Sequence, residues 1–163
     1  FLNSFCLAYE KMKEETALVG IHLKETTNYP QLKIRTKSSA RHLLDLNQYY
    51  FVVQKKTGAF LKEFPKSSKE EKKQKLEAIL NALEKRISKN IADDDMDIPI
   101  NYGFNKNESI VFDTGRFYCS NFEKADAYNN ELVKSVKHLR KYLLENDQDL
   151  VLFFDEALER KKH

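Results

Sequence analysis

The chain has 163 residues, of which 41% are apolar and 11 are phenylalanine, enough for one domain with a sizeable core. Its 28 Lys and Arg against 25 Asp and Glu leave a net charge of only +3, which argues against a nucleic-acid binder because phosphate contacts need concentrated positive charge. Two cysteines and the lack of a long apolar stretch exclude a disulfide framework and a membrane span, so we expect a cytosolic location, in the cell itself or in a host.

The first part of the chain predicts one helix and two strands. Apolar residues at three- and four-residue spacing predict a helix over about residues 4–23, with Ser4 as its N-cap. Residues 31–37 alternate apolar and basic side chains, as a half-exposed strand does. The β-branched and aromatic run at 49–53 predicts a buried strand that is antiparallel to the first and ends by Gly58.

The second part predicts a long helix, a hairpin and two further helices. Ser67 and Glu70 have capping-box spacing, and the helix that they open should end near Asn90. The strands NYGF and SIVFD, joined by the polar turn NKNE, predict a β-hairpin over residues 101–113. Two more helices follow from about Ala125. The expected apolar stripes of the three helices are Leu76, Ile79, Leu80, Leu83 and Ile87; Leu132, Val133, Val136, Leu139 and Leu143; and Leu150, Val151, Phe154 and Leu158.

This order segregates strands from helices, so we predict an α+β fold with a small antiparallel sheet plus helices. A single domain over 1–163 would contain a helix and strands over about 1–62 and a mainly helical part with the hairpin over about 63–163. Because the sequence starts with phenylalanine and not methionine, we expect it to be part of a longer protein.

The hairpin would bring a candidate metal site together. Asn101 opens its first strand and Asp113 closes its second, and these two positions lie side by side in an antiparallel pair. Their amide and carboxylate oxygens suit Mg²⁺, which binds few protein groups and completes its shell with water and phosphate oxygens. The alternative is an Asp113 that only caps a turn, with Gly115 supplying the sharp bend. The acidic residues 93–97 could likewise be a solvated loop, and they lack the glycine and glutamate of a calcium loop.

The same segment resembles the protein-kinase-like superfamily. Pro99 stands two residues before Asn101, Asp113 follows twelve residues later, and Asp113-Thr114-Gly115 has the form Asp-x-Gly. The resemblance implies that Asn101 and Asp113 hold Mg²⁺ and that a catalytic aspartate precedes the asparagine. The usual spacing falls on Met96. Asp97, our candidate for the catalytic residue, therefore needs a one-residue deletion, whereas Asp95 would need an insertion.

The resemblance also implies an ATP site and a kinase-like domain over about residues 1–118. Gln54 and Lys55 would lie at the hinge that cradles adenine, and Glu10 or Glu14 would be the helix glutamate of the family. The sequence departs from the family in having no Gly-rich phosphate loop, no strand lysine before the first helix, and no His-Arg before the base. We therefore expect a nucleotide- and Mg²⁺-binding pseudokinase or phosphotransferase fragment. The alternative is a non-catalytic α+β module that binds a protein partner through its helical surface or a strand edge.

Overall fold

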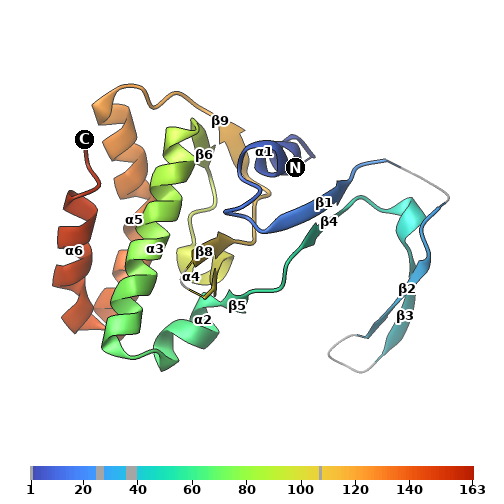
Figure 1. Ribbon diagram of the computed structural model, residues 1–163, viewed down its shortest axis with the longest axis horizontal. Helices are drawn as coiled ribbons and strands as arrows, with labels where there is room; N and C mark the ends of the chain where they lie inside the picture. Colours follow the sequence, from blue (N-terminus) through green and yellow to red (C-terminus); the bar gives the residue numbers. More distant parts are fainter. Residues whose placement is uncertain (1, 25–27, 36–39, 107) are drawn as a thin grey trace.

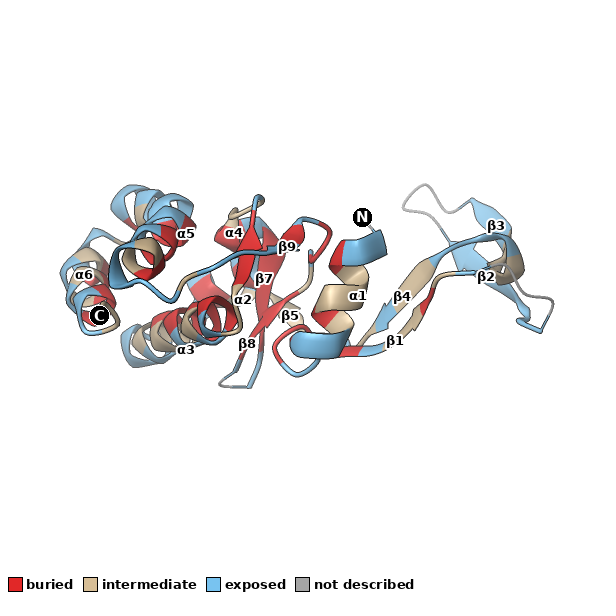
Figure 2. Cartoon of the chain, turned by 90° about the horizontal axis from the view of Figure 1, so that it is seen from above, coloured by how far each residue is buried: buried red, intermediate tan, exposed pale blue. Residues whose placement is uncertain are grey.

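The computed structural model describes residues 2–24, 28–35, 40–106 and 108–163. It confirms the α+β class. Helices α3 (Lys69–Ser88), α5 (Ala125–Asn146) and α6 (Val151–Glu159) stack at one side, small antiparallel sheets lie beside them, and a two-stranded arm projects away at the other end (Figures 1 and 2). Buried residues concentrate between these helices and the central strands, as Figure 2 shows. Within the described residues, no helix is both long and apolar enough to cross a membrane.

The first predicted helix is wrong beyond its first half. Helix α1 spans Leu2–Lys11, and strand β1 (Leu18–His22) follows after a turn. The Thr16 hydroxyl donates to the Met12 carbonyl oxygen at 2.7 Å, and Ala17 has a φ of 52°, a left-handed conformation that a helix cannot contain. β1 then pairs antiparallel with β4 (Phe51–Gln54), so the backbone groups that a longer helix would have used are bonded across a sheet.

The predicted pairing of the next strands is also wrong. Strand β2 (Gln31–Arg35) pairs with β3 (Arg41–Asp45) and not with β4, whose partner is β1. The β2–β3 pair is local in sequence, which lowers the entropy lost on closing the hairpin. The short 3₁₀ helix Leu46–Gln48 leads from β3 toward β4, and the Asp45 carboxylate caps it by accepting from the Asn47 backbone nitrogen at 3.1 Å.

The long helix is confirmed, with its cap moved by one residue. Strand β5 (Gly58–Ala59) leads into helix α2 (Phe60–Glu63), a 3₁₀ turn (Phe64–Lys66) and helix α3 (Lys69–Ser88). The capping box uses Ser68 and Glu71, because the Ser67 hydroxyl is engaged by the preceding turn and donates to the Glu63 carbonyl oxygen at 3.0 Å. All five residues of the predicted apolar stripe are buried.

The predicted hairpin is confirmed. β7 (Tyr102–Asn105) pairs with β8 (Glu108–Val111), and β5 adds to the free side of β7. A Cβ at Gly103 would lie 2.1 Å from the Gly58 carbonyl oxygen, so the close approach of β5 and β7 requires glycine there. Helix α4 (Ile98–Asn101) precedes the hairpin. Strand β6 (Ile91–Asp93), before α4, pairs antiparallel with β9 (Phe117–Cys119), which follows the hairpin in the chain.

The two C-terminal helices are present as expected. They are α5 (Ala125–Asn146) and α6 (Val151–Glu159), joined by the 3₁₀ turn Gln148–Leu150, and both pack on α3. Val133 does not belong to the buried stripe and is exposed, because it is one residue, about 100° of helical rotation, past the buried Leu132.

Candidate functional site

The two predicted metal ligands lie at the same end of the hairpin. Tyr102 is opposite Val111 in the register, and the next step places the backbone of Asn101 beside Phe112. The Phe112 backbone nitrogen donates to the Asn101 carbonyl oxygen at 2.9 Å, so Asp113 begins one residue beyond this bond. Asn101 is the last residue of α4 and does not itself belong to the strand. The local geometry therefore follows the sequence prediction at the level of the backbone.

Each of the two side chains also has a structural partner. The Asn101 amide is buried and donates from Nδ2 to the Asp95 carbonyl oxygen at 3.2 Å, which fixes the acidic loop against α4. One carboxylate oxygen of Asp113, an exposed residue, accepts from the Gly115 backbone nitrogen at 3.0 Å. This is the Asx turn of the alternative interpretation. An amide oxygen and a carboxylate with two acceptor atoms retain the capacity to bind a cation.

Helix α1 holds the turn that follows Asp113. The Ser4 hydroxyl donates to the Thr114 carbonyl oxygen and accepts from the Phe117 backbone nitrogen at 2.7 Å. Ser4 and Thr114 are both buried. Ser4 therefore lies inside α1 and bridges to the turn, whereas the sequence suggested an N-cap. No local sequence signal could have shown this role, because its partners are more than a hundred residues away.

The two predicted hinge residues lie close to the same turn. Gln54 Nε2 donates to the Thr16 carbonyl oxygen at 3.1 Å and to the Phe112 carbonyl oxygen at 3.2 Å. The Lys55 backbone nitrogen donates to the Ala17 carbonyl oxygen at 2.9 Å, while the Lys55 side chain is exposed. Gln54 thus links β4 to the residue before Asp113, and its amide nitrogen is engaged by the protein itself.

The candidate catalytic residue lies before α4. The Asp97 carbonyl oxygen accepts from the Asn101 backbone nitrogen at 2.8 Å, and its carboxylate is 4.0 Å from His138 Nδ1 on α5. The other candidate, Asp95, is half-buried and contacts Asn101 directly through its backbone. Asp97 is therefore joined to Asn101 through the backbone of α4, whereas Asp95 is joined to its side chain.

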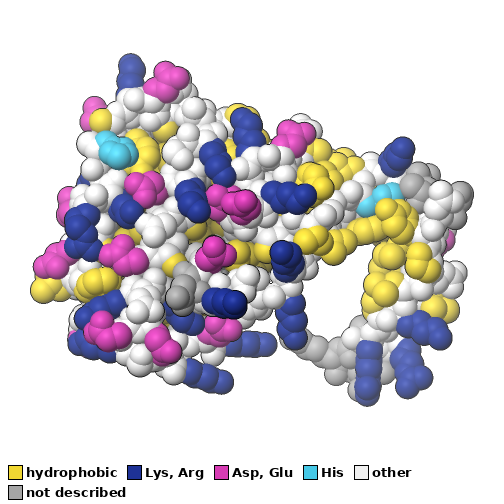
Figure 3. Space-filling view, in the orientation of Figure 1, with side chains coloured by type: hydrophobic (Ala, Val, Ile, Leu, Met, Phe, Trp, Pro, Cys, Tyr) yellow, Lys and Arg dark blue, Asp and Glu magenta, His cyan; other side chains and the backbone are white. Residues whose placement is uncertain are grey.

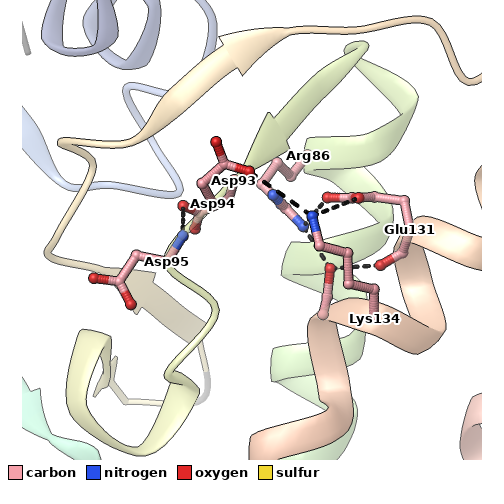
Figure 4. A network of polar contacts seen from close by, with 7 residues as sticks. Arg86, Asp93, Asp94, Asp95, Glu131 and Lys134 are labelled. Carbon is pink, nitrogen blue, oxygen red and sulfur yellow. Dashed lines mark hydrogen bonds and ion pairs between the residues drawn. The ribbon is translucent and has the colours of Figure 1, made fainter.

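A buried polar network lies next to this loop and was missed by sequence reasoning (Figure 4). Arg86 Nη2 on α3 contacts Glu131 Oε1 at 3.2 Å and donates to the Ser135 hydroxyl at 2.6 Å. All three side chains are buried, and Arg86 Nε and Nη1 have no hydrogen-bond partner among the described residues. The one available signal was spacing, because Arg86 is three residues after Leu83 and adjoins Ile87 on the apolar side of α3.

Asp93, at the end of β6, borders this network. Its carboxylate accepts from the Asp95 backbone nitrogen at 2.9 Å. Asp93 as a whole is only 2% exposed. Burial raises the pKa of Asp93 from 3.8 to about 6, although the hydrogen bond from Asp95 and the positive charge of Arg86 oppose this shift. Asp93 therefore changes its charge near neutral pH inside the core, and it is not part of a solvated loop.

The described residues contain no group of three or more His, Cys, Asp or Glu side chains that could hold a metal ion. A cation at the hairpin would thus rely on few protein oxygens and on water or phosphate, as Mg²⁺ does. Comparisons with protein-family models, with curated proteins and with solved structures found no match.

Proposed function

We propose that the protein is a kinase-like module that binds a Mg²⁺–nucleotide complex, without phosphoryl transfer by this chain alone. The observation that carries the proposal is the convergence of three elements at the base of the β7–β8 hairpin. Asn101 ends α4, and Asp113 follows β8. Gln54 from β4 donates to Phe112, which precedes Asp113 in the chain and is itself hydrogen-bonded to Asn101. An amide, a carboxylate and the chain that would cradle adenine are the groups that such a ligand requires.

In this proposal Asn101 Oδ1 and the Asp113 carboxylate contact Mg²⁺, and nucleotide phosphates and water fill its remaining positions. The exposed Lys55 side chain and the backbone beside Gln54 would face the base of the nucleotide. Asp97 would orient an acceptor hydroxyl if a phosphate-binding loop and lysine were supplied from elsewhere. Those two parts are lacking in the sequence, so the proposal is limited to binding.

The test is a thermal melt of wild type and Asp113→Asn, with and without Mg²⁺ and ATP. Asparagine can accept the Gly115 hydrogen bond and keep the Asx turn, but it lacks the negative charge that holds the cation. At about 100 times the dissociation constant a ligand stabilises the native state by about 2.7 kcal/mol, which corresponds to about 5–10 °C for a chain of this size.

We expect this shift in wild type and in the matched control Asp126→Asn, whose carboxylate is exposed at the start of α5. We expect none in Asp113→Asn, whose melting temperature without ligand should stay close to that of wild type. Equal shifts in Asp113→Asn and wild type, or no shift in wild type at millimolar Mg²⁺–ATP, would refute the proposed site.

A second function, binding of a protein partner, is favoured by a separate observation. Of the fifteen large apolar side chains that are exposed among the described residues, eight lie between β1 and the end of β4. Apolar side chains gathered on one projecting part of a molecule are typical of an interaction surface. The two functions are compatible, because this surface does not include Asn101 or Asp113.

A further inference from the structure

The arm is the segment 18–54, formed by β1, β2, β3 and β4, and its far end is the β2–β3 hairpin (Figures 1 and 2). All described residues of β2 are exposed, and Leu43 in β3 is 63% exposed. An isolated two-stranded hairpin is marginally stable in water, and these strands pair only with each other in the described part of the chain. The exposed apolar residues of the arm are Val19, Tyr29, Leu32, Ile34, Leu43, Tyr49, Tyr50 and Val53.

The strand register sorts the hairpin into two faces. Residues that are directly opposite each other project to the same side of the sheet. Leu32 is opposite Leu44, and Ile34 is opposite His42, which makes one face largely apolar. Lys33 is opposite Leu43, Arg35 is opposite Arg41 and Gln31 is opposite Asp45, so the other face carries three basic side chains against one acidic one.

The net charge of the chain resides in the arm. Residues 18–54 contain five Lys and Arg against two Asp and Glu, so their net charge of +3 equals that of the whole protein. The one acidic residue among the described positions of the arm, Asp45, is engaged with Asn47 in capping the 3₁₀ turn. Figure 3 shows hydrophobic side chains along the arm and Lys and Arg side chains at its far end. Charge complementarity thus favours an acidic partner.

A small apolar pocket lies where the arm meets α1. Its volume is about 190 Å³, and it is lined by Leu2 and Phe5 of α1 and by Leu23, Tyr50, Phe51 and Val52. All its lining residues are apolar or aromatic, and the volume accommodates one large apolar side chain. Tyr50 belongs both to this pocket and to the exposed apolar residues of the arm, so the pocket adjoins the apolar surface at the base of the arm.

We infer that the arm and this pocket dock an acidic, extended segment of a partner protein, which seats one large apolar side chain in the pocket. In the described part of the chain β2 and β3 pair only with each other, and the outer edges of residues 31–34 and of β3 supply backbone hydrogen bonds to an extended segment. Lys33 and Arg41 contact its carboxylates, and the apolar residues of the arm bury its alternate side chains. The inference is independent of the nucleotide site.

The test uses a fluorescein-labelled synthetic peptide in which glutamate alternates with valine around a central phenylalanine. Fluorescence anisotropy should show binding to wild type that weakens as the ionic strength rises from about 0.1 to 1 M, where the screening length falls to about 3 Å. The double variant Lys33→Glu with Arg41→Glu should bind about tenfold more weakly, because two attractive pairs become repulsive. The matched control is Lys137→Glu with Lys141→Glu, which makes the same change in net charge at two exposed residues of α5.

Both variants change exposed side chains, so unaltered melting temperatures will show that each is folded. The inference is overturned if a peptide with lysine in place of glutamate binds equally well, or if the control variant weakens binding as much as the arm variant. Sedimentation with phosphatidylserine vesicles, with an oligonucleotide or of the chain alone tests other partners. The inference is also overturned if binding to one of these, or self-association, depends on Lys33 and Arg41 while peptide binding does not. Asp113→Asn should leave peptide binding unchanged, which separates a failure here from a failure of the nucleotide site.

Discussion

The buried Asp93 should cost wild type stability as the pH rises from acid to neutral, because its carboxylate becomes charged. Asp93→Asn should not undergo this loss. Burial raises the pKa of Asp93 from 3.8 to about 6, so the folded state holds this proton more tightly than the unfolded state. The contribution of Asp93 to the free energy of unfolding therefore falls as the pH rises through this window and is constant above it. The shift of roughly 2 pKa units corresponds to a loss of about 3 kcal/mol.

Asparagine can still accept the hydrogen bond from the Asp95 backbone nitrogen, but it carries no charge at any pH. The difference in unfolding free energy between Asp93→Asn and wild type should therefore rise by about 3 kcal/mol between pH 3.5 and pH 7. Urea denaturation at a series of pH values measures this difference, and groups common to both proteins cancel. The control Asp94→Asn, which removes an exposed neighbouring carboxylate, should follow the wild-type pH dependence. A difference that stays flat across this range would refute the buried, proton-binding role of Asp93.

Three further predictions concern stability and are checked by urea denaturation at pH 7. Arg86→Ala should cost about 3–5 kcal/mol because it leaves the buried Glu131 carboxylate with only the more distant, largely exposed Lys134 as a charged partner, and a loss below about 1 kcal/mol would contradict this. Ser68→Ala should lower the free energy of unfolding by about 1 kcal/mol, because α3 loses its N-cap, and an unchanged value would contradict this role of Ser68. Phe64→Ala should cost about 3–5 kcal/mol because its fully buried ring leaves a cavity, whereas the exposed Leu152→Ala should stay within about 0.5 kcal/mol of wild type.

Helices and the hairpin were predictable because their signals are local. The apolar stripe of α3 has the helical period, and the polar turn between β7 and β8 separates two short apolar runs. The segment Leu18–His22 was not predictable in the same way. Its apolar residues fit both a helix and a strand, and pairing with β4, some thirty residues away, decided between them.

In the candidate site too, the local features were predictable from the sequence and the contacts between distant segments were not. Because a hairpin brings the start of one strand beside the end of the next, its sequence predicted that Asn101 and Asp113 would meet at one end. The bonds of Gln54 to Phe112 and of Ser4 to Thr114 join segments that are far apart in the chain, and no spacing rule indicates them. Whether the two candidate ligands bind Mg²⁺ stays a prediction.

The sequence by itself determined the α+β class, the three helices α3, α5 and α6, and the hairpin, because periodicity and turn chemistry act over a few residues. Tertiary structure alone decided which strands pair, which acidic residue is buried and which basic residues are exposed together. Asp93 and Asp94 are neighbours in the chain, yet one lies in the core beside Arg86 and the other is exposed. Burial depends on what packs against a residue, and that is set by contacts between distant segments.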